Sequence, residues 1–281
     1  MATEDRSRRA TKYPPPGLDA KAPNVARVYN AFLGGKDNFA ADRQVVASAL
    51  RVSPKAPAAA RANRAFLRRA VRYLVGETGI TQILDLGSGL PAPGNVHEVA
   101  HEISPSVRTV YVDNDPVVYA HGQALLADSR TTEVMTGDVR RPAEILDHPV
   151  VRQFIDFRQP VGLLLLAVLH HISDDEDPSG IVAALRDAMP DGSHLVISSF
   201  RMPGTDLAEQ RAMTIEMERL FHDRLGSGHW RPEETIRGWF GDWELVPPGL
   251  VPLPAWRPNE PGEVTHDMTY HGFVGGVARK K

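Results

Sequence analysis

The sequence alternates between short apolar runs and segments of helical periodicity from Gly79 onward, and this alternation restricts the fold more than any other feature. The apolar runs predict strands near residues 82–86, 109–112, 132–136, 161–168 and 194–200. The segments between them predict helices near residues 95–103, 116–126, 143–154 and 179–188. Strands that alternate with helices in this way form a mostly parallel sheet with helices on both faces. The chain is therefore predicted to be an α/β protein.

Two more strands are predicted toward the C-terminal end, in ELVPPGLVPL and MTYHGFVGGVAR, with a loop but no helix between them. They bring the predicted sheet to seven strands and follow helices near residues 206–222 and 232–240. Three helices, near residues 24–35, 37–52 and 58–75, precede the first strand. The domain prediction is a disordered arm over 1–20, an N-terminal helical cap over 21–78, and a main domain over 79–281 with a cap insertion at about 202–240.

Composition excludes several classes of protein and of site. The 281 residues have a net charge of −3 and no cysteine. Disulfides, thiolate metal sites and cysteine nucleophiles are therefore excluded, and there is no broad basic surface for nucleic acid. The longest apolar run, Val161 to Leu169, is far shorter than the ~20 residues that cross a bilayer, and the polar first segment is not a secretory signal. We expect a cytoplasmic protein, a monomer or homodimer, without a nucleic-acid or membrane partner.

The first predicted strand ends in the sequence ILDLGSGLP, which indicates a ligand site. Asp85 is followed by Gly87, Ser88 and Gly89. Glycines permit a tight turn and let a ligand approach the backbone, and ligands of open parallel sheets bind beyond the carboxyl ends of the strands. The spacing of the two glycines and Ala92 also fits the loose pattern of dinucleotide-binding turns. The sequence therefore predicts a nucleotide site at this turn.

Two further carboxylates fall at the ends of the next two predicted strands. Asp113 can accept hydrogen bonds from both ribose hydroxyls, and Asp138 can meet an adenine edge. Plainer roles stay open, because Asp113 can cap the following helix and Asp138 can pair with Arg140 or Arg141. Acidic groups at three consecutive strand ends favour a nucleoside ligand.

Two features distinguish a dinucleotide from S-adenosylmethionine as this ligand. A dinucleotide site needs a helix that begins directly after the glycines, whereas Pro91, Pro93 and Gly94 delay the helix. Asp85 would repel a pyrophosphate but would complement the ammonium or sulfonium group of a cationic ligand. The sequence therefore favours S-adenosylmethionine over a nicotinamide nucleotide.

Four motifs, LDLGSG, VYVDNDP, TGDVRRP and LLLAVLHHI, resemble those of class I S-adenosylmethionine-dependent methyltransferases. The segments PNVARVYNAFLGGKDNFAADR and GLPAPGNVHEVA are similar to an actinobacterial family of such enzymes long catalogued as a domain of unknown function. The resemblance implies a Rossmann-like sheet of seven strands, mostly parallel with an antiparallel last strand, and S-adenosylmethionine as cofactor. It places Asn114 beside the adenine ring, and Ala167, Val168 and Leu169 along the methionine part of the cofactor. If Asp138 pairs with an arginine, Val139 would touch the adenine only by packing.

His170 and His171 follow the most hydrophobic predicted strand, at the end where methyl transfer would take place. Either of them could act as a general base toward a hydroxyl or an amine, and a core or capping role is the alternative. Methyl transfer does not require a base, because placing the acceptor against the methyl group can provide much of the acceleration. No pair of carboxylates indicates a metal site, so none is predicted.

The predicted N-terminal helix contains residues that are unusual for a plain covering helix: Tyr29, Asn30, Gly34 and Gly35. The tyrosine and the asparagine can offer hydrogen bonds to a methionine carboxylate, and a pair of glycines permits close approach to a ligand. We predict that this helix closes over the cofactor. The alternative is a helix that packs on the sheet edge and simply ends at the glycines.

The acceptor is predicted to be a small molecule, with oxygen preferred to nitrogen as the methylated atom. The fourth predicted strand ends in AVLHH. Methyltransferases that act on nucleobases or on glutamine often have an Asn or Asp followed by two prolines and an aromatic residue there. Two alternatives stay open, an NAD(P)-dependent oxidoreductase and a non-catalytic protein that binds S-adenosylmethionine.

Overall fold

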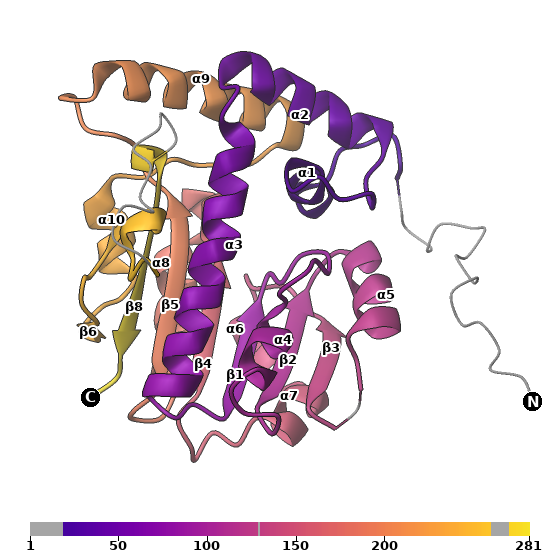
Figure 1. The fold of residues 1–281 in the computed structure, drawn as a ribbon, viewed down its shortest axis with the longest axis vertical. Helices are drawn as coiled ribbons and strands as arrows, with labels where there is room; N and C mark the ends of the chain where they lie inside the picture. The colour runs from indigo at the N-terminus through magenta and orange to yellow at the C-terminus, as the bar shows by residue number, and fades with distance from the viewer. Residues whose placement is uncertain (1–18, 129, 260–269) are drawn as a thin grey trace, which may run out of the picture.

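The computed structural model describes residues 19–128, 130–259 and 270–281 of the chain. These residues form a sheet of eight strands in the order β3-β2-β1-β4-β5-β8-β6, and β7 also pairs with β8 (Figure 1). The strands are β1 (Gln82–Leu86), β2 (Arg108–Asp113), β3 (Thr132–Thr136), β4 (Gly162–Leu166), β5 (His194–Phe200), β6 (Glu244–Leu245), β7 (Val251–Pro252) and β8 (Phe273–Arg279). Of the predicted arm, all but residues 19 and 20 lies outside the described residues.

β1 to β5 run parallel to one another, and β8 lies antiparallel between β5 and β6. This arrangement confirms the predicted α/β fold and its antiparallel last strand. β1 and β4 lie in the middle of the sheet and are buried along their whole length, which explains the apolar run of β4 and the mostly apolar sequence of β1. The bounds of β1, β3 and β5 are the predicted ones.

The prediction of a single strand in ELVPPGLVPL is wrong. The segment forms the two short strands β6 and β7, on either side of Pro247 and Pro248, and each of them pairs with β8. Proline has no N–H group to donate to a sheet ladder, so two consecutive prolines interrupt a strand. The helix predicted over residues 143–154 is also divided, and its second part begins at Pro149.

Helices cover both faces of the sheet (Figure 1). One hydrophobic core lies between the sheet and the helices α6 (Pro142–Leu146), α7 (Pro149–Phe154), α8 (Pro178–Asp187) and α10 (Glu233–Gly238). The core on the opposite face lies beneath α3 (Ala56–Arg72) and α4 (Val96–His101). A π-helical segment, η2 (Tyr73–Glu77), continues α3, and α5 (Pro116–Leu125) packs beside β3. Alternate residues of each central strand enter the two cores, as the pleat of a strand requires.

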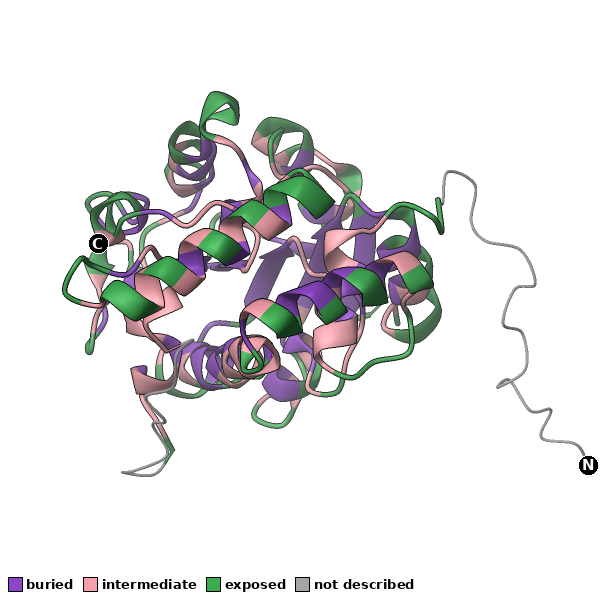
Figure 2. Cartoon of the chain, turned by 90° about the horizontal axis from the view of Figure 1, so that it is seen from above, coloured by how far each residue is buried: buried purple, intermediate pink, exposed green. Residues whose placement is uncertain are grey.

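Three more helices, α1 (Val25–Phe32), α2 (Ala40–Val52) and α9 (Ala208–Leu225), lie above the carboxyl ends of the parallel strands (Figure 1). Figure 2 shows from above that their outer surfaces are exposed while the strands below are buried. Ala49 of α2 packs against Met217 and Phe221 of α9. A buried ion pair joins α1 to α2, with 3.0 Å between Arg27 Nε and Asp42 Oδ2. These helices therefore form a connected roof over one edge of the sheet.

The two long helices α3 and α9 both carry several charged side chains along their length. None of the helices formed by residues 19–128, 130–259 and 270–281 combines the length and the apolar character of a membrane span.

Candidate active site

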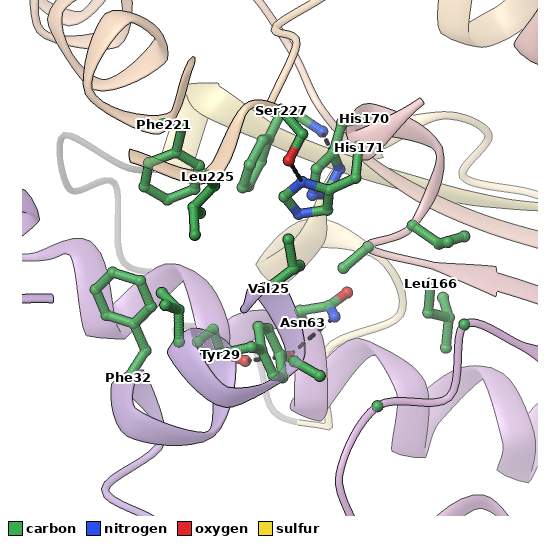
Figure 3. A pocket seen from close by; sticks show the side chains of 18 of the residues that line it. Val25, Tyr29, Phe32, Asn63, Leu166, His170, His171, Phe221, Leu225 and Ser227 are labelled. Atoms are coloured by element: carbon green, nitrogen blue, oxygen red, sulfur yellow. Dashed lines mark hydrogen bonds between the residues drawn. The ribbon is translucent and has the colours of Figure 1, made fainter. Parts of the chain in front are cut away.

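A cavity of about 430 Å³ lies between the carboxyl ends of the parallel strands and the roof helices α1 and α9 (Figure 3). Its volume is in the range of ligand-binding sites, ~300–1,000 Å³. Its position agrees with the rule that ligands of open α/β sheets bind beyond the carboxyl ends of the strands. Most of the predicted cofactor residues line it: Tyr29, Asp85, Gly87, Ser88, Gly89, Asp113, Asn114, Asp138, Val139, Ala167 and Val168.

The turn after β1 brings backbone, rather than side chains, to the cavity wall. Gly87 and Gly89 adopt positive φ angles of 71° and 68°, which favour glycine. A Cβ atom added to Gly87 would lie 2.6 Å from Val168 Cγ2, so any larger residue would collide with the end of β4. Because the two glycines have no side chains, a ligand can approach the main chain at this wall of the cavity.

Asp85 is a buried carboxyl group on the cavity wall, 5% exposed. Burial raises its pKa to about 7; the charge of Arg64 acts in the opposite direction, and that of Asp113 adds to the rise. None of the described residues donates a hydrogen bond to its carboxyl oxygens. A buried carboxylate without a donor is costly, so this group would gain from a cationic ligand.

Asp113, at the end of β2, is also buried, and its carboxyl group holds the glycine turn in place. Its Oδ2 accepts a hydrogen bond from the backbone N–H of Gly89 at 2.8 Å, and its Oδ1 accepts one from Asp115 N–H at 3.0 Å. Burial raises its pKa to about 6, against the effect of these backbone bonds. The capping role belongs to Asp115, which accepts the N–H of Val117 at the start of α5. Asp113 therefore joins the ends of β1 and β2 at the cavity.

Asp138 lines the cavity, but its carboxylate forms an ion pair with Arg140, which is the alternative that the sequence left open. Its Oδ2 lies 2.6 Å from Arg140 Nη2, and Arg140 also pairs with Glu176 at 2.7 Å. The Arg140 hydrogen bonds lower the pKa of the Asp138 carboxyl group. Val139 lies beside it on the cavity wall.

Arg64 of α3 is a cavity residue that the sequence prediction missed. Its Nη2 donates to the carbonyl oxygens of Ala92, Pro93 and Gly94, at 3.2, 3.3 and 3.0 Å, so it holds the loop after the glycine turn. The side chain lines the cavity near Asp85, and its charge lowers the pKa of that carboxyl group. In the sequence Arg64 is one of several arginines on an amphipathic helix, and no local signal distinguishes it from them.

The end of β4 brings Ala167 and Val168 to the cavity. Leu169 instead packs in the hydrophobic core on the α8 face of the sheet and does not line the cavity, contrary to the prediction. Ala167 has a positive φ of 59°, unusual for a residue other than glycine. Its N–H donates to the carbonyl oxygen of Ser198 at 3.1 Å and to Ser198 Oγ at 3.0 Å. This bend places the next residues, in η3 (Leu169–His171), beside the cavity.

The two histidines of η3 have different environments. His170 is 1% exposed, its ring stacks on Phe200 with 3.6 Å between centroids, and its Nδ1 accepts the backbone N–H of Phe200 at 3.2 Å. His171 Nδ1 lies 2.9 Å from Ser227 Oγ, and the other edge of its ring faces the cavity (Figure 3). Burial lowers both pKa values, that of His171 to about 3. His171 is therefore the neutral imidazole that a ligand can reach.

The N-terminal helix covers the cavity, but its polar residues contact protein groups. The Tyr29 hydroxyl donates to the carbonyl oxygen of Ala60 at 3.1 Å, so its proton is not available for the predicted carboxylate contact. Asn30 is turned away from the cavity and accepts hydrogen bonds from Asp37 N–H and Asn38 Nδ2. Gly34 and Gly35 end the helix and do not line the cavity, as the alternative prediction of a helix that simply ends at the glycines requires. Among the described residues, no three His, Asp or Glu side chains come together as metal ligands.

Comparison with known proteins identifies the family of this chain. The profile of a family described as S-adenosyl methyltransferase matches residues 11–281. The chain belongs to this family of S-adenosyl methyltransferases. The resemblance to class I methyltransferases that its motifs indicate is thereby confirmed, and the alternative of a nicotinamide-dependent oxidoreductase is removed.

Solved structures agree with the family. A protein from Thermobifida fusca described as a candidate methyltransferase is 46% identical, covers 96% of this chain and 100% of its own, and has a TM-score of 0.89. A protein of the DUF574 family, a domain of unknown function, from Streptomyces avermitilis is 35% identical, covers 94% and 99% of the two chains, and has a TM-score of 0.87. A plantazolicin methyltransferase in complex with S-adenosylhomocysteine shares the fold at 10% identity, 91% and 95% coverage and a TM-score of 0.53. A search of curated proteins finds no match.

S-adenosylmethionine is the cofactor of this methyltransferase, and the cavity suits it. The cofactor carries an ammonium and a sulfonium group, and the buried, donor-free carboxyl group of Asp85 is the complement that these cations need. The positive-φ glycines leave room for its approach to the backbone after β1. The chemistry of the wall therefore agrees with the family.

Proposed function

We propose that this methyltransferase transfers the methyl group of S-adenosylmethionine to a hydroxyl oxygen of a small-molecule acceptor. The observation that carries the proposal is the position of His171, whose ring faces the cavity just beyond the end of β4, the strand that pairs with β1. A neutral imidazole at this place can accept a proton from the group that receives the methyl.

The cofactor residues are proposed from the cavity wall. Asp113 would accept the ribose hydroxyls, Asp85 would face the cationic groups, and Asn114 and Val139 would border the adenine ring. Arg64 would hold the methionine carboxylate, because among the described lining residues Arg140 is already paired with the carboxylates of Asp138 and Glu176, whereas Arg64 donates its hydrogen bonds to neutral carbonyl oxygens. Tyr29, Ala167 and Val168 would pack along the methionine part.

His171 and Ser227 would handle the proton of the acceptor. When bound, S-adenosylmethionine supplies a methyl group on a positively charged sulfur, and the electron pair of the broken C–S bond stays with that sulfur. With Nδ1–H donating to Ser227 Oγ, the lone pair of His171 Nε2 faces the cavity and can accept the hydroxyl proton. The low pKa of His171 suits a late proton transfer, because an oxygen that has gained a methyl is far more acidic than the hydroxyl before transfer.

A binding assay and a product assay test this proposal separately. Titration calorimetry should show that the purified protein binds S-adenosylhomocysteine and does not bind NAD. Cell extract incubated with the protein and isotope-labelled S-adenosylmethionine should yield a labelled small molecule whose methyl group, by NMR, is on oxygen. A methyl group on nitrogen, or label only in protein or nucleic acid, would contradict the proposal.

A further inference from the structure

The cavity is divided by charge. Its charged lining residues all lie on the sheet side or on α3: Arg64, Asp85, Asp113, Asp115, Asp138 and Arg140. The part under the roof, which we call the acceptor chamber, is bounded by apolar side chains of α1 and α9: Val28, Phe32, Met213, Met217, Phe221 and Leu225. Within the described ranges, no residue with a formal charge borders the acceptor chamber.

A column of stacked rings forms one wall of the acceptor chamber. The centroid of the Phe200 ring lies 3.6 Å from the centroid of the His170 ring and 4.1 Å from that of the Trp230 ring. The interplanar angles are 18° and 9°. Two more pairs meet edge to face: the ring centroids of Phe221 and Trp230 are 5.6 Å apart, and those of Phe273 and Phe200 are 5.0 Å apart. Stacked and edge-on rings of this kind form a rigid surface that favours contact with another ring.

The polar groups of the acceptor chamber are neutral. Burial lowers the pKa of His171 to about 3 and that of His170 well below its ordinary value, so neither ring is a cation near neutral pH. Ser227 and Thr214 add neutral hydroxyls to the lining, and Thr214 is 3% exposed. An ion placed here would lose its hydration without gaining a counter-charge, which is costly. A neutral hydroxyl has partners here and a charged group has none.

We propose that the methyl acceptor is an uncharged aromatic or conjugated ring compound that carries a hydroxyl group, with the ring in the acceptor chamber and the hydroxyl beside His171. The inference rests on the proposed function and names the class of acceptor for the same site. The apolar side chains of α1 and α9 would cover one side of the ring, and Trp230 would meet it from the aromatic wall.

Two ring compounds that differ only in charge test the inference. With the protein saturated with S-adenosylhomocysteine, binding of naphthol and of a hydroxynaphthalenesulfonate is measured by calorimetry. Naphthol should bind roughly tenfold or more tightly than the sulfonate, because the sulfonate places an unpaired charge in the acceptor chamber. Equal binding of the two compounds, or tighter binding of the sulfonate, would overturn the inference.

A pair of variants on α9 tests the location. Met213→Glu places a carboxylate in the acceptor chamber, while Ala212→Glu places the same charge on the exposed side of the same helix. The first change should weaken naphthol binding roughly tenfold or more, and the second should leave it unchanged. Leu225→Glu is a second cavity variant in case Met213→Glu does not fold. Unchanged naphthol binding in a folded cavity variant would overturn the location.

The cofactor assay keeps the two proposals separate. All folded variants should bind S-adenosylhomocysteine as the parent protein does, because these positions lie away from the charged half of the cavity. If the parent protein fails to bind S-adenosylhomocysteine, the proposed function fails. If it binds S-adenosylhomocysteine but does not discriminate between the two naphthalene compounds, only the acceptor class fails.

Discussion

The side-chain amide of Asn63 donates a hydrogen bond to the Tyr29 hydroxyl at 3.0 Å and so joins α3 to the roof helix α1. Asn63 Oδ1 in turn accepts the hydroxyl of Ser198 at 2.7 Å, and Ser198 Oγ accepts the N–H of Ala167 at 3.0 Å. A continuous path of hydrogen bonds therefore connects the roof to the bent backbone at the end of β4. These bonds join the roof to the cavity end of the sheet.

The first prediction is that Tyr29 and Asn63 are energetically coupled. A double-mutant cycle with Tyr29→Phe and Asn63→Ala should give a coupling of about 0.5–3 kcal/mol in the free energy of unfolding, measured with denaturant, because the two side chains share one hydrogen bond. The control pairs Tyr29→Phe with Gln123→Ala, whose side chain bonds to β3 elsewhere. Additive effects in the first cycle would show that the path carries no coupling.

The second prediction concerns cofactor affinity and Asp113. Asp113→Ala should weaken S-adenosylhomocysteine binding by ~1.5–3 kcal/mol, the range for a hydrogen bond to a charged group. Part of the loss comes from the glycine turn, whose Gly89 N–H loses its acceptor. Calorimetry measures the change, and Asp191→Ala, at an exposed position in the loop before β5, is the control. An unchanged affinity would remove Asp113 from the cofactor site.

The third prediction is a pH dependence of cofactor binding that arises from Asp85. Burial first, and Asp113 in addition, raise the pKa of Asp85 to about 7, so the carboxyl group loses its charge as the pH falls through neutrality. Affinity for S-adenosylmethionine should fall roughly tenfold from about pH 8 to about pH 6, because the cation loses its partner. In Asp85→Asn the affinity should be low and nearly independent of pH. The same slope in both proteins would assign the effect to another group.

The fourth prediction concerns stability without the cofactor. The pKa of Asp85 in the folded chain is about 7, against an ordinary value of 3.8, so the folded state binds the proton more tightly between these pH values. The free energy of unfolding therefore falls as the pH rises through this window, and the loss is complete above about pH 7. Asp85→Asn should be more stable than the parent by up to about 4 kcal/mol at about pH 8 and not near pH 4. Denaturant unfolding at both pH values measures this, and a variant less stable at both would contradict it.

The fifth prediction is that the roof helix tightens when the cofactor binds. S-adenosylhomocysteine should slow amide exchange across residues 28–39, because α1 covers the cavity and its end is held by the Asn30 side chain. α8, which packs on the face of the sheet opposite α3, is the internal control and should not change. Equal exchange in residues 28–39 with and without the ligand would show that α1 is a fixed wall.

The strands and the glycine turn were predictable because the signals for them are local. A buried central strand is mostly apolar, and an acid followed by two glycines is typical of the end of such a strand, so ILDLGSG predicts both β1 and the place of Asp85. Strands that alternate with helices place all these ends on one edge, which brings Asp113 and Asp138 to the same cavity. The division of ELVPPGLVPL also had a local signal, the two prolines, which the strand prediction did not weigh.

The partner of each polar side chain was decided only when distant elements packed together. Arg64 reaches the cavity because α3 crosses the face of the sheet beside the loop after β1. The Tyr29 hydroxyl is bound to Ala60 and Asn63 because α1 lies on α3. His170 is enclosed because the ring of Phe200 stacks on it, while His171 faces the cavity. A sequence pattern specifies which face of a helix or strand is apolar, but hydrogen-bond partners depend on distances and angles between elements. Those distances exist only in the folded chain.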